Sequence, residues 1–168
     1  MAIIETERLS LREFTADDAA FILELLNSPG WLQFIGDRNI KNLTDAERYI
    51  EATLQKSYKT NGFGFYAIWL KDEEKPIGMS GLVKRDFLEV MDVGFAMLPE
   101  FTNKGYAVEA AAATLNFAKT NLNVNRLGAI ALPANSRSIT LLQKLGFSFQ
   151  EMVKSNGEEL SLFMKELE

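Results

Sequence analysis

Cysteine and histidine are both absent from this chain of 168 residues. Without cysteine the protein cannot form disulfides, thiolate metal sites or a cysteine acyl-enzyme, and this composition suits a reducing compartment. Without histidine it lacks the usual base at neutral pH and the commonest metal ligand. Any general base must therefore be a carboxylate, a tyrosine, a lysine or water, and we expect no metal site.

Long apolar runs are missing as well. No segment approaches the ~18 apolar residues of a membrane span, and residues 1–12 lack the apolar stretch of a signal peptide. We therefore expect a cytoplasmic protein with no membrane partner. The net charge of -5 argues against a nucleic-acid partner. The length and a hydrophobic content of 47% predict a single globular domain over residues 1–168.

Hydrophobic periodicity predicts a mixed α/β fold. Strand-like patterns occur at 8–14, 63–70, 77–83, 90–97, 127–132, 147–153 and 160–165. Helical spacing starts after Thr15, after a capping box of Thr44 with Glu47, and again over 105–120 and 136–145. The element order predicts a sheet that is antiparallel at both ends, with parallel pairing in the middle, where helices connect strands.

The segment 93–110 carries the strongest chemical signal. A buried strand leads through a turn directly into a helix, so the free amides of the first helical turn point at whatever occupies the turn. Gly105 lets the backbone approach an anion, Lys104 adds positive charge, and Ala107 keeps the start of the helix uncrowded. The pattern favours an anion site, although an ordinary strand-to-helix connection has the same spacing.

A second segment, 135–147, follows another expected strand. Asn135 is typical of a helix cap and Gly146 of a helix stop, and each residue alone indicates structure more than function.

Together the two segments resemble the GNAT superfamily of acyl-CoA N-acyltransferases. The resemblance spans nearly the whole chain and is nearest to the RimJ/RimL-like branch, which includes ribosomal-protein N-terminal acetyltransferases. Residues 6–12 are similar to that branch's first strand, and residues 76–82 to its third. The resemblance implies a largely antiparallel, twisted sheet of about seven strands flanked by about four helices.

The resemblance also implies acetyl-CoA as co-substrate. The family's pyrophosphate loop runs from Gln or Arg to Gly or Ala and is matched by residues 102–107, with Thr102 as a mild departure. The implied cofactor contacts are the loop residues Asn103, Lys104, Gly105, Tyr106 and Ala107, the strand residues Phe95, Ala96 and Met97, and the second-helix residues Asn135 and Ser138. The strand would hold the pantetheine arm as if the arm were an added strand.

Without cysteine or histidine, direct attack of an amine on the thioester is the economical mechanism. Many family members carry a tyrosine as the acid where this chain has Leu142, so the resemblance to the RimL-like branch favours Ser138. For the base we favour Asp92, with Glu109 and Glu89 as rivals. An ordinary solvated position at the surface would also explain each of these three acidic residues. For Glu109, favourable negative charge at a helix start is a further explanation.

The acceptor site is the least defined part. Trp31 and Phe34 lie in the segment that lines the acceptor site in this family, although such an apolar stripe is more typical of core. We expect an acetyl-CoA-dependent N-acetyltransferase that acts on a primary amine, either a peptide N-terminus or a small molecule. A non-catalytic acyl-CoA sensor is the alternative. Both a monomer and a homodimer are compatible with the sequence.

Overall fold

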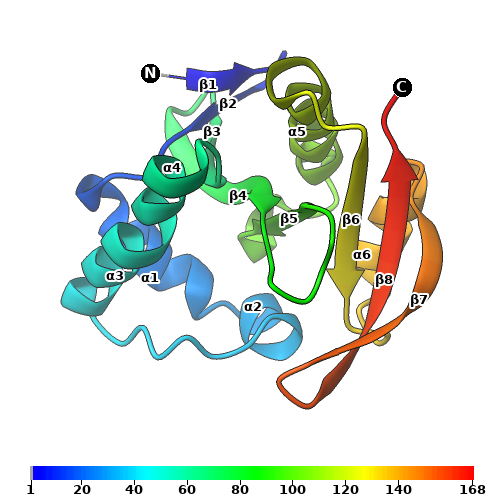
Figure 1. Cartoon of the computed structure of the whole chain (residues 1–168). Coiled ribbons are helices and arrows are strands. Elements are labelled where there is room, and N and C mark those ends of the chain that lie inside the picture. Colours follow the sequence, from blue (N-terminus) through cyan, green and yellow to red (C-terminus); the bar gives the residue numbers. More distant parts are fainter. Residues whose placement is uncertain (1) are drawn as a thin grey trace.

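The computed structural model describes residues 2–168, which form one eight-stranded sheet with helices on both faces (Figure 1). The strands are β1 (Ala2–Glu5), β2 (Leu9–Arg12), β3 (Phe65–Leu70), β4 (Lys75–Val83), β5 (Asp92–Met97), β6 (Arg126–Ala131), β7 (Ser148–Ser155) and β8 (Glu158–Glu166). The α-helices are α1 (Ala19–Leu26), α2 (Pro29–Phe34), α3 (Leu43–Tyr49), α4 (Lys56–Asn61), α5 (Tyr106–Leu122) and α6 (Ser136–Lys144).

The strand order is β1-β2-β3-β4-β5-β6-β8-β7. All neighbouring strands run antiparallel except β5 and β6, which are parallel. The expected mixed sheet with parallel pairing at its centre is thus confirmed. The strand beyond the expected seven is β1, whose four residues are too few to show a clear alternation.

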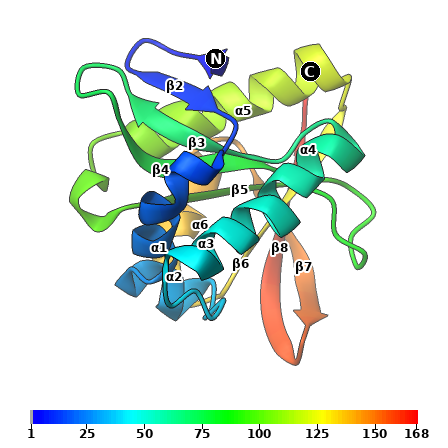
Figure 2. The same cartoon turned by 90° about the vertical axis from the view of Figure 1, so that its left-hand side faces the viewer.

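Helices α1 to α4 lie on one face of the sheet and α5 and α6 on the other (Figures 1 and 2). The first face is sealed by a cluster in which helix residues such as Ile22 and Leu25 meet Met79 of β4 and Leu98 just after β5. On the second face, Leu115 of α5 and Leu142 of α6 share a cluster with Val93 and Phe163. Burial of both faces explains why the central strands are apolar almost throughout.

The helical segments number five along residues 2–168, because α3, the π-helical segment η2 (Ile50–Gln55) and α4 form one continuous run. The short helix α2, begun by Pro29, was not expected. No helix in this part of the chain is both long and apolar enough to cross a bilayer.

The start of α3 corrects one expectation. Asn42, not Thr44, caps the helix, and its side chain accepts a hydrogen bond from the Asp45 N–H at 2.8 Å. Asn is as good a cap as Thr, and here it precedes the first helical residue, so the Thr44–Glu47 pair falls inside the helix. Thr15 and Asp18 do form a capping box, before the short 3-10 turn η1 (Ala16–Asp18).

Candidate active site

A gap between the parallel strands β5 and β6 is the central feature of the site. These strands are registered through one residue pair, Asp92 with Gly128, and the Gly128 N–H donates to the Met91 carbonyl at 2.9 Å. By contrast, β4 and β5 are registered through six pairs. No further register joins β5 to β6 within residues 2–168, so the two strands part after Asp92.

The edge of β5 that faces this gap can pair with an extended ligand. Backbone groups of successive strand residues point to alternate edges. The Met91 carbonyl accepts a hydrogen bond from β6, and the Leu98 N–H donates one to the Ile77 carbonyl of β4. By this alternation, the N–H and C=O groups of Phe95 and Met97 point toward β6. Ala96 turns its own toward β4. Of the three expected strand contacts, Phe95 and Met97 can therefore offer backbone hydrogen bonds, whereas Ala96 is restricted to its side chain.

The loop after β5 leads directly into α5. A short 3-10 turn, η3 (Pro99–Phe101), is followed by Asn103 and Gly105 in left-handed conformations, with φ of 61° and 83°. Asn is among the few non-glycine residues that adopt this conformation readily, so its place here suits the turn. Gly105 is the N-cap of α5 and has no side chain to cap it, which leaves the amides around Tyr106 and Ala107 oriented toward the turn. Lys104 is exposed beside them.

Asp92 lies at the point where β5 and β6 part. Its carboxylate is buried, with 2% side-chain exposure, and Arg85 donates to Oδ1 at 3.0 Å from the loop between β4 and β5. Burial raises the pKa of Asp92 to about 6, against the lowering effect of the Arg85 guanidinium. A carboxylate with such a pKa is largely ionised at neutral pH yet basic enough to accept a proton from an amine. The expected base role is thus chemically possible but requires a path through its buried surroundings.

Asn135 and Ser138 lie together at the start of α6. The Asn135 Oδ1 accepts from the Ser138 N–H at 3.3 Å, and Asn135 Nδ2 donates to Ser138 Oγ at 3.0 Å. Asn135 is thus a helix cap, as its residue type indicates. Because Ser138 Oγ accepts a hydrogen bond from the Asn135 side-chain amide, its own hydroxyl remains able to donate a hydrogen bond to another group. Leu142, the position at which the resemblance implied a tyrosine in other members, is buried in the core.

Glu109 and Glu89, the two alternative bases, lie in surroundings different from those of Asp92. Glu109 accepts hydrogen bonds from the Thr6 hydroxyl at 2.5 Å, the Arg8 N–H at 3.0 Å and the Arg8 Nε at 2.7 Å. Partial burial raises its pKa, but these donors outweigh burial and lower the pKa overall. Such a carboxylate is a poor base, and its geometry is that of a structural anchor. Glu89 is exposed on the loop between β4 and β5, where it lines an open groove with Lys84.

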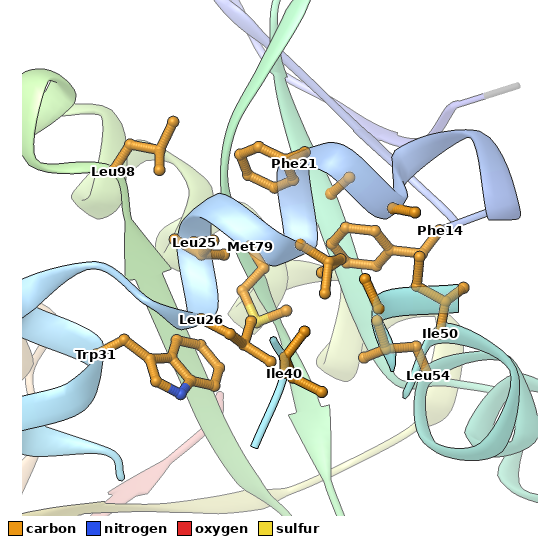
Figure 3. Packing of buried hydrophobic residues seen from close by; sticks show 14 residues of the cluster. Phe14, Phe21, Leu25, Leu26, Trp31, Ile40, Ile50, Leu54, Met79 and Leu98 are labelled. Carbon is orange, nitrogen blue, oxygen red and sulfur yellow. The ribbon is translucent and has the colours of Figure 1, made fainter. Parts of the chain in front are cut away.

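Trp31 is core, as the apolar stripe suggested. It belongs to the same buried cluster as Leu26 and Ile40 and is 6% exposed (Figure 3). Its indole Nε1 is buried without a hydrogen-bond partner among the described residues. Phe34, at the end of α2, is half-buried. No group of histidine, cysteine, aspartate or glutamate within residues 2–168 is arranged to hold a metal ion.

Two arginines were not anticipated as part of the site. Arg85 is the partner of Asp92, and Arg8 contacts the loop before α5. The alternation in residues 8–14 places Arg8 on the solvent side of a strand, but sequence alone gives no signal for a partner about a hundred residues away. Arg85 lies in a loop, where local pattern gives no pairing information.

Comparison with known proteins places this arrangement in a family. Residues 8–148 match the acetyltransferase (GNAT) domain. The uncharacterized N-acetyltransferase YjdG of Bacillus subtilis is 30% identical over 156 residues, which make up 88% of this chain and 90% of that protein.

Solved structures show the same fold. The ribosomal-protein-S5-alanine acetyltransferase of Vibrio fischeri has a TM-score of 0.80 at 21% identity, over 96% of this chain and 94% of the other. The microcin C7 self-immunity acetyltransferase MccE, solved with acetyl-CoA and AMP, has a TM-score of 0.78 at 15% identity, over 96% and 94%. With a family match over most of its length, this protein belongs to the GNAT acetyltransferase family and is an acyltransferase.

Proposed function

We propose that the protein transfers the acetyl group of acetyl-CoA to a primary amine, and that the acceptor is the α-amine of a peptide or protein N-terminus. The observation that carries the proposal is the gap between β5 and β6, which opens beside the loop that begins α5. An extended chain in the gap can pair with Phe95 and Met97, and its phosphate end then reaches the amides of 103–107.

Acetyl-CoA fits these elements as a substrate. The pantetheine arm carries amide groups that can continue the pairing of β5 as an added strand. The pyrophosphate is an anion suited to a helix N-terminus with a left-handed turn and an exposed Lys104. Support comes from MccE, a fold neighbour that binds acetyl-CoA. Asn135 and Ser138 would contact the arm from α6.

The reaction we propose is direct transfer. The neutral amine attacks the thioester carbonyl, the tetrahedral intermediate expels the CoA thiolate, and the amine nitrogen loses one proton. A backbone N–H of β5 facing the gap can stabilise the oxyanion. Asp92 accepts the amine proton, directly or through a water molecule, and the Ser138 hydroxyl donates a hydrogen bond to the departing thiolate.

An N-terminal α-amine is the acceptor that this machinery suits best. Its unperturbed pKa is about 7.7 to 8.0, against about 10.4 for lysine, so far more of it is nucleophilic at neutral pH. A single carboxylate base is then adequate. The net charge of -5 modestly favours cationic acceptors. The fold shared with a ribosomal-protein-S5-alanine acetyltransferase also agrees with an acceptor of the RimJ/RimL type.

The experiment is a screen for CoA release across N-terminal peptides, polyamines, amino sugars and free amino acids. Because the chain has no cysteine, every thiol detected comes from CoA. We expect N-terminal peptides to give the highest kcat/KM, with product mass confirming one added acetyl group on the α-amine. Acetylation restricted to lysine side chains, with all free N-termini unmodified, would refute the proposal.

A further inference from the structure

Arg8, which immediately precedes β2, reaches across to the loop before α5. Its Nη1 donates to the Lys104 carbonyl at 3.2 Å, and its guanidinium carbon lies 4.4 Å from the centre of the Tyr106 ring. Its Nε donates to Glu109 Oε1 at 2.7 Å, and its backbone N–H donates to Glu109 Oε2 at 3.0 Å. The Arg8 side chain thus contacts three positions around the start of α5: Lys104 before the N-cap, Tyr106 as the first helical residue and Glu109 as the fourth.

The contact with the Lys104 carbonyl has a directional consequence. In a planar trans peptide the C=O and the following N–H point in opposite directions. When Arg8 holds the Lys104 carbonyl, the Gly105 N–H must therefore point to the opposite side of the loop. Rotation of this one peptide unit would reverse both groups and present a carbonyl oxygen where an amide is needed. The unit is bounded by the permissive Gly105, whose φ is 83°, so local sterics alone hold it weakly.

We propose that Arg8 is a positioning residue for the cofactor: it locks the Lys104–Gly105 peptide so that the Gly105 N–H faces the phosphates of acetyl-CoA. This inference rests on the proposed function. Arg8 acts from behind the loop, through the orientation of a backbone group.

The anchor of Arg8 is itself fixed. Glu109 accepts from the Thr6 hydroxyl at 2.5 Å, and the Lys71 ammonium donates to the Thr6 carbonyl at 2.6 Å. The carboxylate of Glu109 thereby ties the turn between β1 and β2 to the first turn of α5. Glu109 is then part of the positioning device and not a proton acceptor in the reaction. The same network explains how a segment at the start of the chain bears on a loop near residue 105.

Arg12 provides a matched control. It lies at the other end of β2. Its guanidinium carbon is also 4.4 Å from an aromatic ring centre, that of Trp69, and its Nη2 donates to Glu74 Oε2 at 3.3 Å. It shares the chemistry of Arg8 but has no contact with the loop before α5.

The test compares Arg8→Met with Arg12→Met by calorimetric titration with CoA, and records the thermal midpoint of each variant without ligand. We expect Arg8→Met to weaken CoA binding about tenfold, because a loop that is binding-competent one tenth of the time loses affinity by that factor. Arg12→Met should bind as the wild type does. S-acetylpantetheine, which has no pyrophosphate, should be turned over equally well by all three proteins.

Arg8→Lys separates positioning from simple attraction of charge. Lysine keeps the charge but cannot bond the Lys104 carbonyl and Glu109 in one planar fork, so its affinity for CoA should stay reduced. Wild-type affinity in Arg8→Lys, or equal losses in Arg8→Met and Arg12→Met, would overturn the inference. A loss of S-acetylpantetheine turnover in Arg8→Met as large as its loss of CoA affinity would also overturn it. A wild-type protein that binds no CoA would instead refute the proposed function itself.

Discussion

Two arginine–carboxylate pairs stand at opposite ends of the segment that runs from β5 into α5, and their carboxylates behave differently. Asp92 is paired with Arg85, is almost wholly buried and has a pKa raised to about 6. Glu109 is paired with Arg8, retains 20% side-chain exposure and has a lowered pKa. An arginine partner is common to both, so the partner alone does not set the pKa.

The difference lies in the balance between burial and hydrogen-bond donors. Burial raises the pKa of both carboxylates and is the largest single influence on each. Glu109 receives the Thr6 hydroxyl, a backbone N–H and a guanidinium, which together overcome burial. Asp92 receives one guanidinium contact and a weaker contribution from its own backbone N–H, which together do not overcome burial. The first arrangement favours a permanent anion that holds structure, and the second favours a group that exchanges a proton near neutral pH.

Catalytic activity should separate the two carboxylates most strongly. Asp92→Asn should lower kcat by about 10³-fold, within the range of acid–base catalysis, because the amine loses its proton acceptor. In the wild type, kcat/KM for the amine should rise with pH through about 6 as Asp92 ionises, and the variant should lack this step. Glu109→Gln at saturating acetyl-CoA should keep both the rate and the step. Superimposable pH profiles for wild type and Asp92→Asn would assign the base elsewhere.

A second test of Asp92 measures how the free energy of unfolding depends on pH. Asp92 has a folded pKa above its unfolded value, so the folded state binds more protons between pH 3.8 and about 6, and stability falls as pH rises across that window. The expected contribution is on the order of 3 kcal/mol. Urea unfolding from pH 4 to 7 measures it, and Asp92→Asn should remove the decline. Glu109, with its lowered pKa, contributes stability that is lost as pH falls, so Glu109→Gln should leave the decline intact.

The third prediction concerns the loop beside the Glu109 pair. Gly105→Val should weaken CoA binding about 100-fold, because a branched side chain at φ 83° strains the turn and crowds Arg8. Gly157→Val is the control: Gly157 has φ of 81° in the turn between β7 and β8, and no atom lies within 4 Å of an added Cβ. Both variants should lose similar thermal stability, but only Gly105→Val should lose affinity. Unchanged calorimetric affinity in Gly105→Val would remove the loop from the cofactor site.

The last prediction concerns Ser138, which we propose assists departure of the CoA thiolate. Ser138→Ala should lower kcat by roughly 10-fold to 100-fold with little change in acetyl-CoA affinity, because its hydroxyl acts mainly on the departing thiolate. A thiol of pKa about 8.5 leaves tolerably well unaided, which keeps the effect modest. Ser136→Ala, an exposed position on the same helix, serves as the comparison. Full turnover in Ser138→Ala would show that the thiolate departs without its help.

Several elements of the fold were predictable because their signals are local. The hairpin of β3 and β4 follows from two apolar runs around a charged turn, and Asn135 announces the start of α6 by its residue type. The left-handed turn before α5 was readable in Asn103 and Gly105. The strand β1 and the helix α2 were not, because four and six residues are too short to show a period.

The composition and the order of residues were enough to limit the available chemistry and to locate the loop that we propose holds the cofactor. The lack of cysteine and histidine restricts the general base to a carboxylate, a tyrosine, a lysine or water. The order of residues 93–110 indicates a strand, a turn and a helix in succession. The pKa of each carboxylate, by contrast, depends on the three-dimensional fold. Asp92 and Glu109 are both acids near the same segment, and a pKa depends on burial and on donors brought from residues 6, 8 and 85, whose positions no local pattern specifies.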